Sequence, residues 1–335
     1  MSKRYMLFIL AFIIMGMIGS CEESTTEPWA DLSESYQLTV NVINETDSPT
    51  EADLAVLKNG EVIESETASS AQYTLPSAEP YVIRAIKSFA TGETDTLTYT
   101  VALAEDWEHT FTFITGDIDA NLLAHYSFEG NLDEATSQWS AGSETGDRIT
   151  NTGGSISFAS GKVGQAAVFD GASGIRLPDT LITDHTYAVS LWLNPASINQ
   201  FTTAFFGGTV NDDVEAWISL TPAGPGDDAY TMLWNRLFDA NTGDDIWYDG
   251  TTGMQIPVNQ WSHIVFSADA GKLKVYVDGV EKFSGSDHPD VFSAYNAIFA
   301  LAVNHWDVPF EGMMDELRVY SRAIGERTVA NLMNE

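Results

Sequence analysis

The sequence has a single cysteine, Cys21, among its 335 residues. The chain therefore forms no internal disulfide, and no cysteine nucleophile is available beyond position 21. A secreted chain of this kind relies on its hydrophobic core for stability. Its length suits about two domains.

Basic residues are also scarce. The chain carries 15 Lys and Arg against 48 Asp and Glu, a formal net charge of -33. Such a chain repels nucleic acids and anionic lipid surfaces, so we expect no DNA or RNA partner. The acids are spread through a sequence that is 44% hydrophobic, so the charge does not imply disorder. We expect a folded protein with an acidic, solvated surface that can accommodate cations.

The apolar run at residues 5–18 is shorter than the roughly 20 residues that a membrane-spanning helix needs. Lys3 and Arg4 precede this run, and Gly19 and Ser20 lead into Cys21. A basic start, an apolar segment and small residues before a cleavage site are typical of a secretory signal. Removing residues 1–20 takes away the two basic residues and no acid, so the net charge changes from -33 to -35.

Residues 18–21, Ile-Gly-Ser-Cys, resemble the bacterial lipobox. The resemblance implies cleavage before Cys21 and a lipid on its thiol, with each buried CH₂ contributing about 0.8 kcal/mol to anchoring. An ordinary signal peptide with an incidental cysteine is the alternative. We expect a signal peptide at 1–20, a flexible tether at 21–35 and a lipid anchor in the outer membrane of the cell envelope. The acidic pair 22–23 weakly resembles a cell-surface export signal, although a solvated linker explains it equally well.

Strict alternation of apolar and polar residues begins at Tyr36 and continues through positions 38, 40 and 42, which predicts a half-buried strand. Asn59-Gly60 predicts a tight hairpin turn. Further short strands are indicated at 73–75, 81–86, 97–103 and 111–113. Together these segments predict a small β-sandwich over residues 36–116. The pattern is similar to carboxypeptidase-regulatory and immunoglobulin-like modules, and because no residue stands out chemically we expect a spacer domain.

Residues 120–335 are predicted to form a second all-β unit. Its predicted strands are 122–128, 165–169, 187–193, 203–206, 214–220, 230–235, 261–268, 272–277, 297–303 and 310–320. Asp278-Gly279 predicts another tight hairpin. Apolar residues at 324, 329, 332 and 333 predict a short terminal helix that covers a sheet. So many strands suit two stacked antiparallel sheets, a jelly roll, and the predicted fold class is all-β.

Specific strings of this second unit carry a family resemblance. They are LAHYSFEGNLDE at 123–134, GQAAVFDG at 164–171, AVSLWLNP at 188–195, WSHIVF at 261–266, LKVYVDG at 273–279 and FEGMMDELRVYSRAI at 310–324. In this order they resemble the laminin-G-like, concanavalin-A-like jelly-roll family over nearly all of 120–335. That family includes carbohydrate-binding modules, adhesion modules, pentraxin-like proteins and accessory domains of enzymes, and the fold alone does not decide among them.

Motifs for catalysis are missing from the sequence. Glucanases on this fold resemble one another in a Glu-x-Asp-x-Glu strand, which places an acid and a nucleophile on one face, and no such string occurs here. Asp315 and Glu316 are adjacent, so in a regular strand they are expected to point to opposite faces. The six histidines form no His-Glu-x-x-His motif. We expect no catalytic activity and keep a glycoside hydrolase, with an acid pair assembled by folding, as the alternative.

A structural calcium ion is the predicted cofactor. Calcium takes hard oxygen ligands, and residues 128–133 alternate such donors in a tight loop. In the family that this unit resembles, the loop lies against the strand that carries Asp315. The candidate ligands are Glu129, Asn131, Asp133 and Asp315. The alternative is that Asn131 and Asp133 only cap a turn.

Aromatic residues indicate a ligand surface. Trp192 and Trp261 lie in the family strings and are expected in the core, whereas residues 205–248 depart from those strings and are rich in aromatic and polar residues. Sugars bind with their C–H faces on aromatic rings and their hydroxyls bonded by polar side chains. The predicted ligand-binding residues are Trp234, Arg236, Trp247, Tyr248 and Trp306. The alternative is that half of these rings fill the sandwich.

These expectations describe a cell-envelope lipoprotein, anchored through Cys21, that presents a non-catalytic binding module. Carbohydrate is the expected ligand. Adhesion to an extracellular protein is kept as a further alternative.

Overall fold

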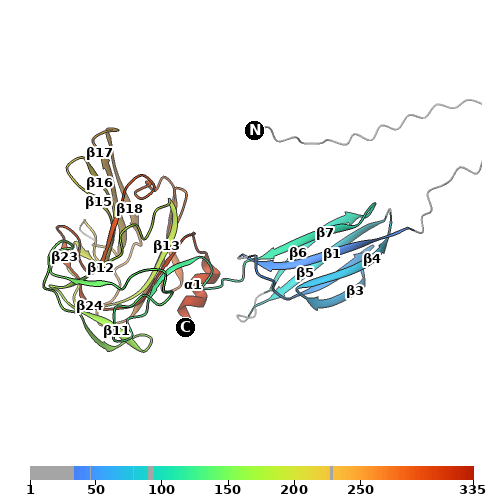
Figure 1. Cartoon of the computed structure of the whole chain (residues 1–335), viewed down its shortest axis with the longest axis horizontal. Coiled ribbons are helices and arrows are strands. Elements are labelled where there is room, and N and C mark those ends of the chain that lie inside the picture. The colour runs from blue at the N-terminus through green and yellow to red at the C-terminus, as the bar shows by residue number, and fades with distance from the viewer. Residues whose placement is uncertain (1–33, 46, 78, 90–93, 227–228) are drawn as a thin grey trace, which may run out of the picture.

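The computed structural model describes residues 34–45, 47–77, 79–89, 94–226 and 229–335. It forms two β-sandwiches joined near residue 116 (Figure 1). The predicted signal peptide, the lipidation site Cys21 and nearly all of the predicted tether lie outside the described residues. Among the residues that are described, no helix is both long and apolar enough to cross a membrane.

The N-terminal sandwich packs a three-stranded sheet, in the order β4-β1-β7, against a four-stranded sheet, in the order β3-β2-β5-β6. The strands are β1 (Ser35–Asn44), β2 (Ala52–Lys58), β3 (Glu61–Ala68), β4 (Ser70–Pro76), β5 (Pro80–Ser88), β6 (Thr94–Ala102) and β7 (Trp107–Phe113). The alternation that the sequence predicts for β1 is confirmed, because Leu38, Val40 and Val42 are fully buried in its core.

The C-terminal sandwich packs an eight-stranded sheet against a seven-stranded sheet. The larger sheet has the order β10-β11-β24-β13-β19-β20-β21, with β8 also pairing with β24, and the smaller has the order β18-β17-β16-β15-β22-β12-β9. The strands of the larger sheet are β8 (Leu122–Tyr126), β10 (Ser157–Ser160), β11 (Gln165–Asp170), β13 (Thr186–Pro195), β19 (Ser262–Asp269), β20 (Lys272–Val277), β21 (Val280–Gly285) and β24 (Glu311–Tyr320). Those of the smaller are β9 (Ser143–Thr145), β12 (Gly174–Leu177), β15 (Phe205–Val210), β16 (Val214–Thr221), β17 (Met232–Asp239), β18 (Asp244–Thr251) and β22 (Ile298–Leu301). A short parallel pair, β14 (Thr202–Thr203) and β23 (Val308–Pro309), completes the unit.

The predicted all-β class is confirmed, and so are both predicted hairpin turns. Asn59 and Gly60 adopt φ of 53° and 83° between β2 and β3. Asp278 and Gly279 adopt φ of 50° and 79° between β20 and β21. Positive φ at both central residues is the geometry that a two-residue hairpin requires.

The predicted terminal helix is present as α1 (Glu326–Met333). Its buried residues Val329 and Leu332 pack on the outer face of the eight-stranded sheet, against Tyr276 and Tyr320. Trp192, predicted in the core, is only 5% exposed on that sheet, whereas Trp261 is half-buried.

The junction between the sandwiches is held from both sides. Glu45 accepts hydrogen bonds from the amides of Thr115 (2.8 Å), Gly116 (2.8 Å) and Asp117 (3.2 Å), and from the Thr115 hydroxyl (3.0 Å). From the other side, the Asn331 side chain on α1 donates to the Gly116 carbonyl at 2.7 Å.

Helix α1 also reaches the N-terminal sandwich directly. The Arg327 guanidinium pairs with Asp95 at 3.0 Å, donates to the carbonyl of Ile114 and lies 3.7 Å above the ring of Phe89. The junction is therefore a polar seam between two folded bodies rather than a free linker.

We predict that Glu45→Gln destabilises the junction in a pH-dependent way. Partial burial acts to raise the pKa of Glu45, but the hydrogen bonds from Thr115 and Gly116 outweigh it and hold the pKa below its usual value. A lowered pKa contributes stability above the pKa of the unfolded state, and this contribution is lost as the pH falls through the folded-state pKa. We expect the variant to lose about 2 kcal/mol at pH 7, measured by calorimetry, and the loss to shrink below about pH 4. An equal loss at pH 7 and pH 3 would contradict this account.

Candidate functional site

The outer face of the seven-stranded sheet carries a row of aromatic residues. In the register of β16, β17 and β18, Trp217 lies opposite Arg236, which in turn lies opposite Trp247. In the neighbouring row of outward-facing residues, Ser219 lies opposite Trp234, which lies opposite Asp249. The residues that alternate with these along the strands, such as Ile218, Leu233 and Leu237, pack toward the core. Because successive residues of a strand alternate in direction, Trp217, Trp234 and Trp247 share the outer face.

The indole rings form one cluster around Trp217, which is only 2% exposed. Trp234 and Trp247 meet it edge to face, with ring centroids at 5.2 and 5.9 Å, and stack on each other at 5.5 Å. Trp306, from the loop before β23, meets Trp217 at 5.7 Å. Trp247 and Trp306 remain 50% and 40% exposed. We call Trp217, Trp234, Trp247 and Trp306 the tryptophan surface.

Gly208 on β15 makes room for this cluster. It lies directly opposite Trp217 in the sheet, and a Cβ atom at this position would lie 2.4 Å from the Trp217 Cβ. Real Cβ atoms do not approach one another so closely. Gly207 and Gly208 are part of a regular strand, and here glycine permits the close approach.

Arg236 is fixed at the edge of the tryptophan surface. Its guanidinium pairs with Glu215 at 2.5 Å and with Asp245 at 3.2 Å, and it lies 4.8 Å from the ring centre of Trp247. Ion pairs of partly exposed groups contribute little to stability, but these two hold the guanidinium in one orientation. Arg236, predicted as a ligand-binding residue, therefore lies at the border of the tryptophan surface.

The Trp306 loop is held by Asn304, which is 1% exposed. The side-chain oxygen Oδ1 of Asn304 accepts hydrogen bonds from the backbone amides of Trp306 (2.9 Å) and Asp307 (2.7 Å). Its amide nitrogen donates to the Thr203 hydroxyl (3.0 Å) and to the Asp307 carboxylate (2.7 Å). Burial raises the pKa of Asp307 above its usual value. The loop backbone is thus fixed while the Trp306 ring projects into solvent.

Tyr248 does not belong to the tryptophan surface. It is adjacent to Trp247 on β18 and therefore points to the opposite face. Its ring packs edge to face on Phe283 and His288 at the margin of the core. Its hydroxyl is buried. Of the five predicted ligand-binding residues, the structure brings together Trp234, Arg236, Trp247 and Trp306 and separates Tyr248 from them.

Two residues of the cluster were not selected from the sequence. Phe206 on β15 meets Trp306 at 6.2 Å, and His305 stacks beside Trp306 at 5.5 Å. Only the cross-strand register places Phe206 beside Ser219 and hence next to the tryptophans. The signal for His305 was present, because it lies in the polar-aromatic loop 304–307.

Chemically, the arrangement is an apolar platform with a polar margin. Flat indole rings offer large apolar contact at little entropic cost, and carboxylates and a guanidinium around them can bond hydroxyl groups. Two carboxylates at its margin, Glu215 and Asp245, are both paired with Arg236.

Comparison with known proteins bears on the C-terminal sandwich. The family profile of the concanavalin A-like lectin/glucanase superfamily matches residues 169–330. Domain 4 of AbnA, a GH43 extracellular arabinanase from Geobacillus stearothermophilus solved with arabinotriose, is 48% identical, with a TM-score of 0.58; the match covers 64% of this chain and 98% of that domain. The chain belongs to the concanavalin A-like lectin/glucanase superfamily.

A solved structure of lower similarity is the binding domain of Paraclostridial Mosquitocidal Protein 1. It is 15% identical with a TM-score of 0.48, and the match covers 65% of this chain and 53% of that one. A comparison with curated protein sequences found no match.

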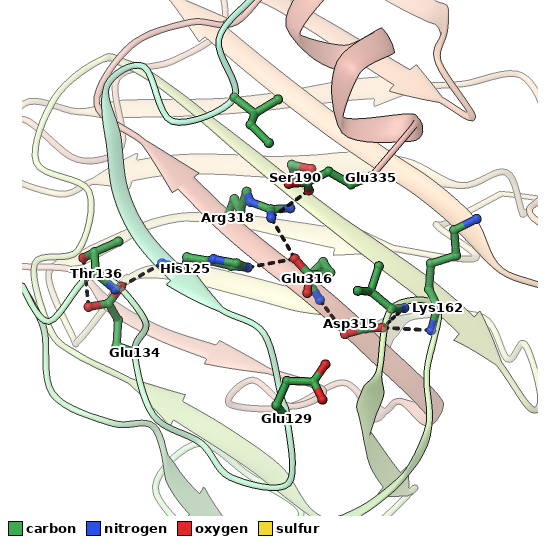
Figure 2. Close-up of polar contacts among 12 residues, drawn as sticks. His125, Glu129, Glu134, Thr136, Lys162, Ser190, Asp315, Glu316, Arg318 and Glu335 are labelled. Atoms are coloured by element: carbon green, nitrogen blue, oxygen red, sulfur yellow. Dashed lines mark hydrogen bonds and ion pairs between the residues drawn. The ribbon is translucent and has the colours of Figure 1, made fainter.

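The acids of β24 lie on the opposite side of the sandwich and form a buried polar network (Figure 2). The pairing of β13 with β24 shifts register between Ser190 and Trp192, so Glu316 and Leu317 together oppose a single residue, and Glu316 adopts φ of 52°. This bulge places Asp315 and Glu316 both outside the core. The prediction that the two acids point to opposite faces is wrong, because the bulge interrupts the alternation.

Each of these acids is already engaged by the protein. Asp315 accepts from the amides of Lys162 (2.8 Å), Val163 (3.0 Å) and Glu316 (2.9 Å). Burial raises the pKa of Asp315 to about 6. Glu316 contacts His125 and Arg318, each at 2.8 Å. Asp315 fixes the loop at Lys162 and Val163, and Glu316 holds Arg318. Both carboxyls are buried, so neither is accessible for hydrolysis.

The predicted calcium ligands make hydrogen bonds within the protein. Both oxygens of Glu129 accept from the Gln165 amide at 3.1 Å, and Asn131 accepts from the Asp133 amide at 2.8 Å, as in an Asx turn. Asp315 is saturated by backbone amides. Across the described part of the chain, no three His, Cys, Asp or Glu side chains are grouped to hold a metal ion. Structural calcium stays a prediction that only a binding measurement tests.

We expect chelation with EDTA to leave the melting temperature of the protein unchanged. The reason is that the carboxylates of Glu129 and Asp315 already bond backbone amides, so their contribution to native-state stability does not require a bound ion. The control is Asp315→Asn, which should lower the melting temperature equally with and without EDTA. A drop with EDTA that calcium reverses in the wild type, but not in Asp315→Asn, would restore the calcium prediction.

Proposed function

We propose that the C-terminal sandwich is a non-catalytic carbohydrate-binding module and that the tryptophan surface is its binding site. The observation that carries the proposal is the cluster of four indoles on an outer sheet face, with Trp247 and Trp306 half exposed. Contact between large aromatic rings and water is unfavourable, so exposed clusters of such rings mark surfaces that a partner covers. The C–H face of a sugar ring matches such a platform in both shape and polarity.

The charges around the tryptophan surface indicate whether its sugar ligand is acidic or neutral. The tryptophan surface is bordered by Glu215, Asp245 and Asp307, with Arg236 already paired to the first two. The chain as a whole carries a formal net charge of -33. These charges repel acidic polysaccharides and favour a neutral sugar.

An arabino-oligosaccharide is the first ligand to test. The 48% identical domain 4 of the GH43 arabinanase was solved with arabinotriose. This similarity extends over nearly the whole of that domain and supports the same ligand class for the C-terminal sandwich.

The adjacent acids Asp315 and Glu316 do not support the glycoside-hydrolase alternative. Both are buried and already bonded to other groups of the protein. Adhesion to an extracellular protein uses the same kind of exposed aromatic surface. It becomes the favoured function if the wild type binds no oligosaccharide but retains a protein partner through Trp247.

We expect Trp247→Ala and Trp306→Ala each to weaken binding of arabinotriose at least tenfold by calorimetric titration, because each removes an exposed platform ring. The melting temperature should stay within about 2 °C of the wild type, since exposed side chains contribute little to stability.

The matched control is Trp107→Ala, which removes a 43% exposed tryptophan from the N-terminal sandwich. Its affinity should equal that of the wild type. If Trp247→Ala and Trp306→Ala also bind normally, the tryptophan surface is not the site.

We further propose that the chain is a lipoprotein. In this proposal Cys21 carries the lipid, the N-terminal sandwich is a spacer, and the binding module is held at the outer membrane, facing the cell surface. The lipobox-like residues 18–21 and the preceding apolar run support it.

Metabolic labelling with an alkyne analogue of palmitate tests this anchor. The wild-type chain should take up the label and sediment with membranes, whereas Cys21→Ser should be unlabelled and soluble, because the lipidated residue is gone. An unlabelled wild-type chain, cleaved and soluble, would instead support an ordinary signal peptide.

A further inference from the structure

The central indole of the tryptophan surface has an unused hydrogen-bond donor. Trp217 is 2% exposed, and its ring nitrogen Nε1 is buried with no hydrogen-bond partner among the described residues. Buried donors are almost always paired, because an unpaired one has lost its hydrogen bonds to water without replacement, which is unfavourable. Trp139, by comparison, donates its ring N–H to the Leu123 carbonyl at 3.0 Å. The unpaired group in Trp217 therefore needs an explanation.

A second unpaired nitrogen lies in the same cluster. His305 Nε2 is buried and has no partner within the described structure. Burial, with a smaller effect from Arg176, lowers the pKa of His305, so the imidazole is neutral at pH 7. A neutral imidazole has one nitrogen that donates and one that accepts.

Trp306 adjoins both groups. Its ring lies 5.7 Å from that of Trp217 and 5.5 Å from that of His305, and it is 40% exposed. Its backbone is fixed by Asn304. Because the loop backbone is held in this way, a change of the Trp306 side-chain rotamer requires no rearrangement of the loop.

We propose that Trp217 Nε1 and His305 Nε2, whose rings both contact Trp306, form a polar subsite that receives hydroxyl groups of a neutral sugar. One hydroxyl accepts from the Trp217 N–H and another donates to His305, while the Trp306 ring turns to pack on the sugar face. A sugar hydroxyl can accept or donate a hydrogen bond, so the hydroxyls of one sugar suit both nitrogens. This inference rests on the proposed carbohydrate-binding function and names the atoms that orient the ligand.

Calorimetric titration of the full chain with arabinotriose tests the subsite. Trp217→Phe keeps an aromatic ring but removes the N–H, and His305→Phe removes the acceptor. Each should weaken binding about tenfold, the loss expected for one buried hydrogen bond. The control is Trp192→Phe, which changes a tryptophan that is 5% exposed on the other sheet and should bind as the wild type does.

Monodeoxy analogues of arabinotriose give a sharper readout. One analogue, lacking the hydroxyl that enters the subsite, should bind the wild type about tenfold more weakly than arabinotriose does. When the missing hydroxyl is the one that accepts from Trp217, the same analogue and arabinotriose should bind equally well to Trp217→Phe, because the partner of that hydroxyl is already missing.

The outcomes separate the two proposals. If the wild type binds arabinotriose, Trp247→Ala abolishes binding, and Trp217→Phe and His305→Phe bind normally, the subsite is overturned and the tryptophan surface stands. If Trp217→Phe lowers the melting temperature more than Trp192→Phe does and leaves binding unchanged, the N–H serves the neighbouring ring faces instead. If the wild type binds no arabinotriose, the proposed ligand class and the subsite fail together.

Discussion

The regular alternation of side chains along β16, β17 and β18 is the constraint on which the candidate site depends. One set of residues fills the space between the sheets, and the other set faces outward. Antiparallel register then places the outward residues of neighbouring strands opposite one another, which brings indoles from distant positions into contact. A slip of one residue in any of these pairings would send its tryptophan into the core and a core residue into water.

The two faces of the C-terminal sandwich use their polar groups differently. On the eight-stranded sheet the buried acids are consumed by the fold: Asp315 bonds three amides, and Glu316 joins His125 and Arg318. On the seven-stranded sheet, Trp217 and His305 each bury a nitrogen without a partner. Among the described residues, unpaired buried atoms also occur on the eight-stranded sheet, at Arg318 Nε and His263 Nδ1, so what distinguishes the seven-stranded sheet is the exposed rings of Trp247 and Trp306 beside its unpaired nitrogens.

Local chemistry made much of the fold predictable from the sequence. Asn59-Gly60 and Asp278-Gly279 specify their turns through backbone preferences alone, and the apolar residues of α1 specify its buried side. The family strings identified the jelly roll of the C-terminal sandwich, and the profile match bears this out.

The errors came from long-range geometry. Residues 244–251 were not predicted as a strand, so nothing indicated that Trp247 and Tyr248 would face opposite ways. The bulge at Glu316 reflects how β13 and β24 pair, which neither strand reveals alone. Nor does the sequence show that the loop after β10 supplies amide donors to Asp315, or that the first residue of β11 supplies one to Glu129.

The seam at residue 116 has a mechanical consequence. Because Glu45 holds three successive amides while Arg327 and Asn331 hold the same stretch from α1, rotation of one sandwich against the other would break several bonds together. The two bodies then lie end to end as a single stiff unit (Figure 1). A pulling force on a ligand bound to the C-terminal sandwich would be transmitted through this junction to the N-terminal sandwich without rotation of one sandwich against the other.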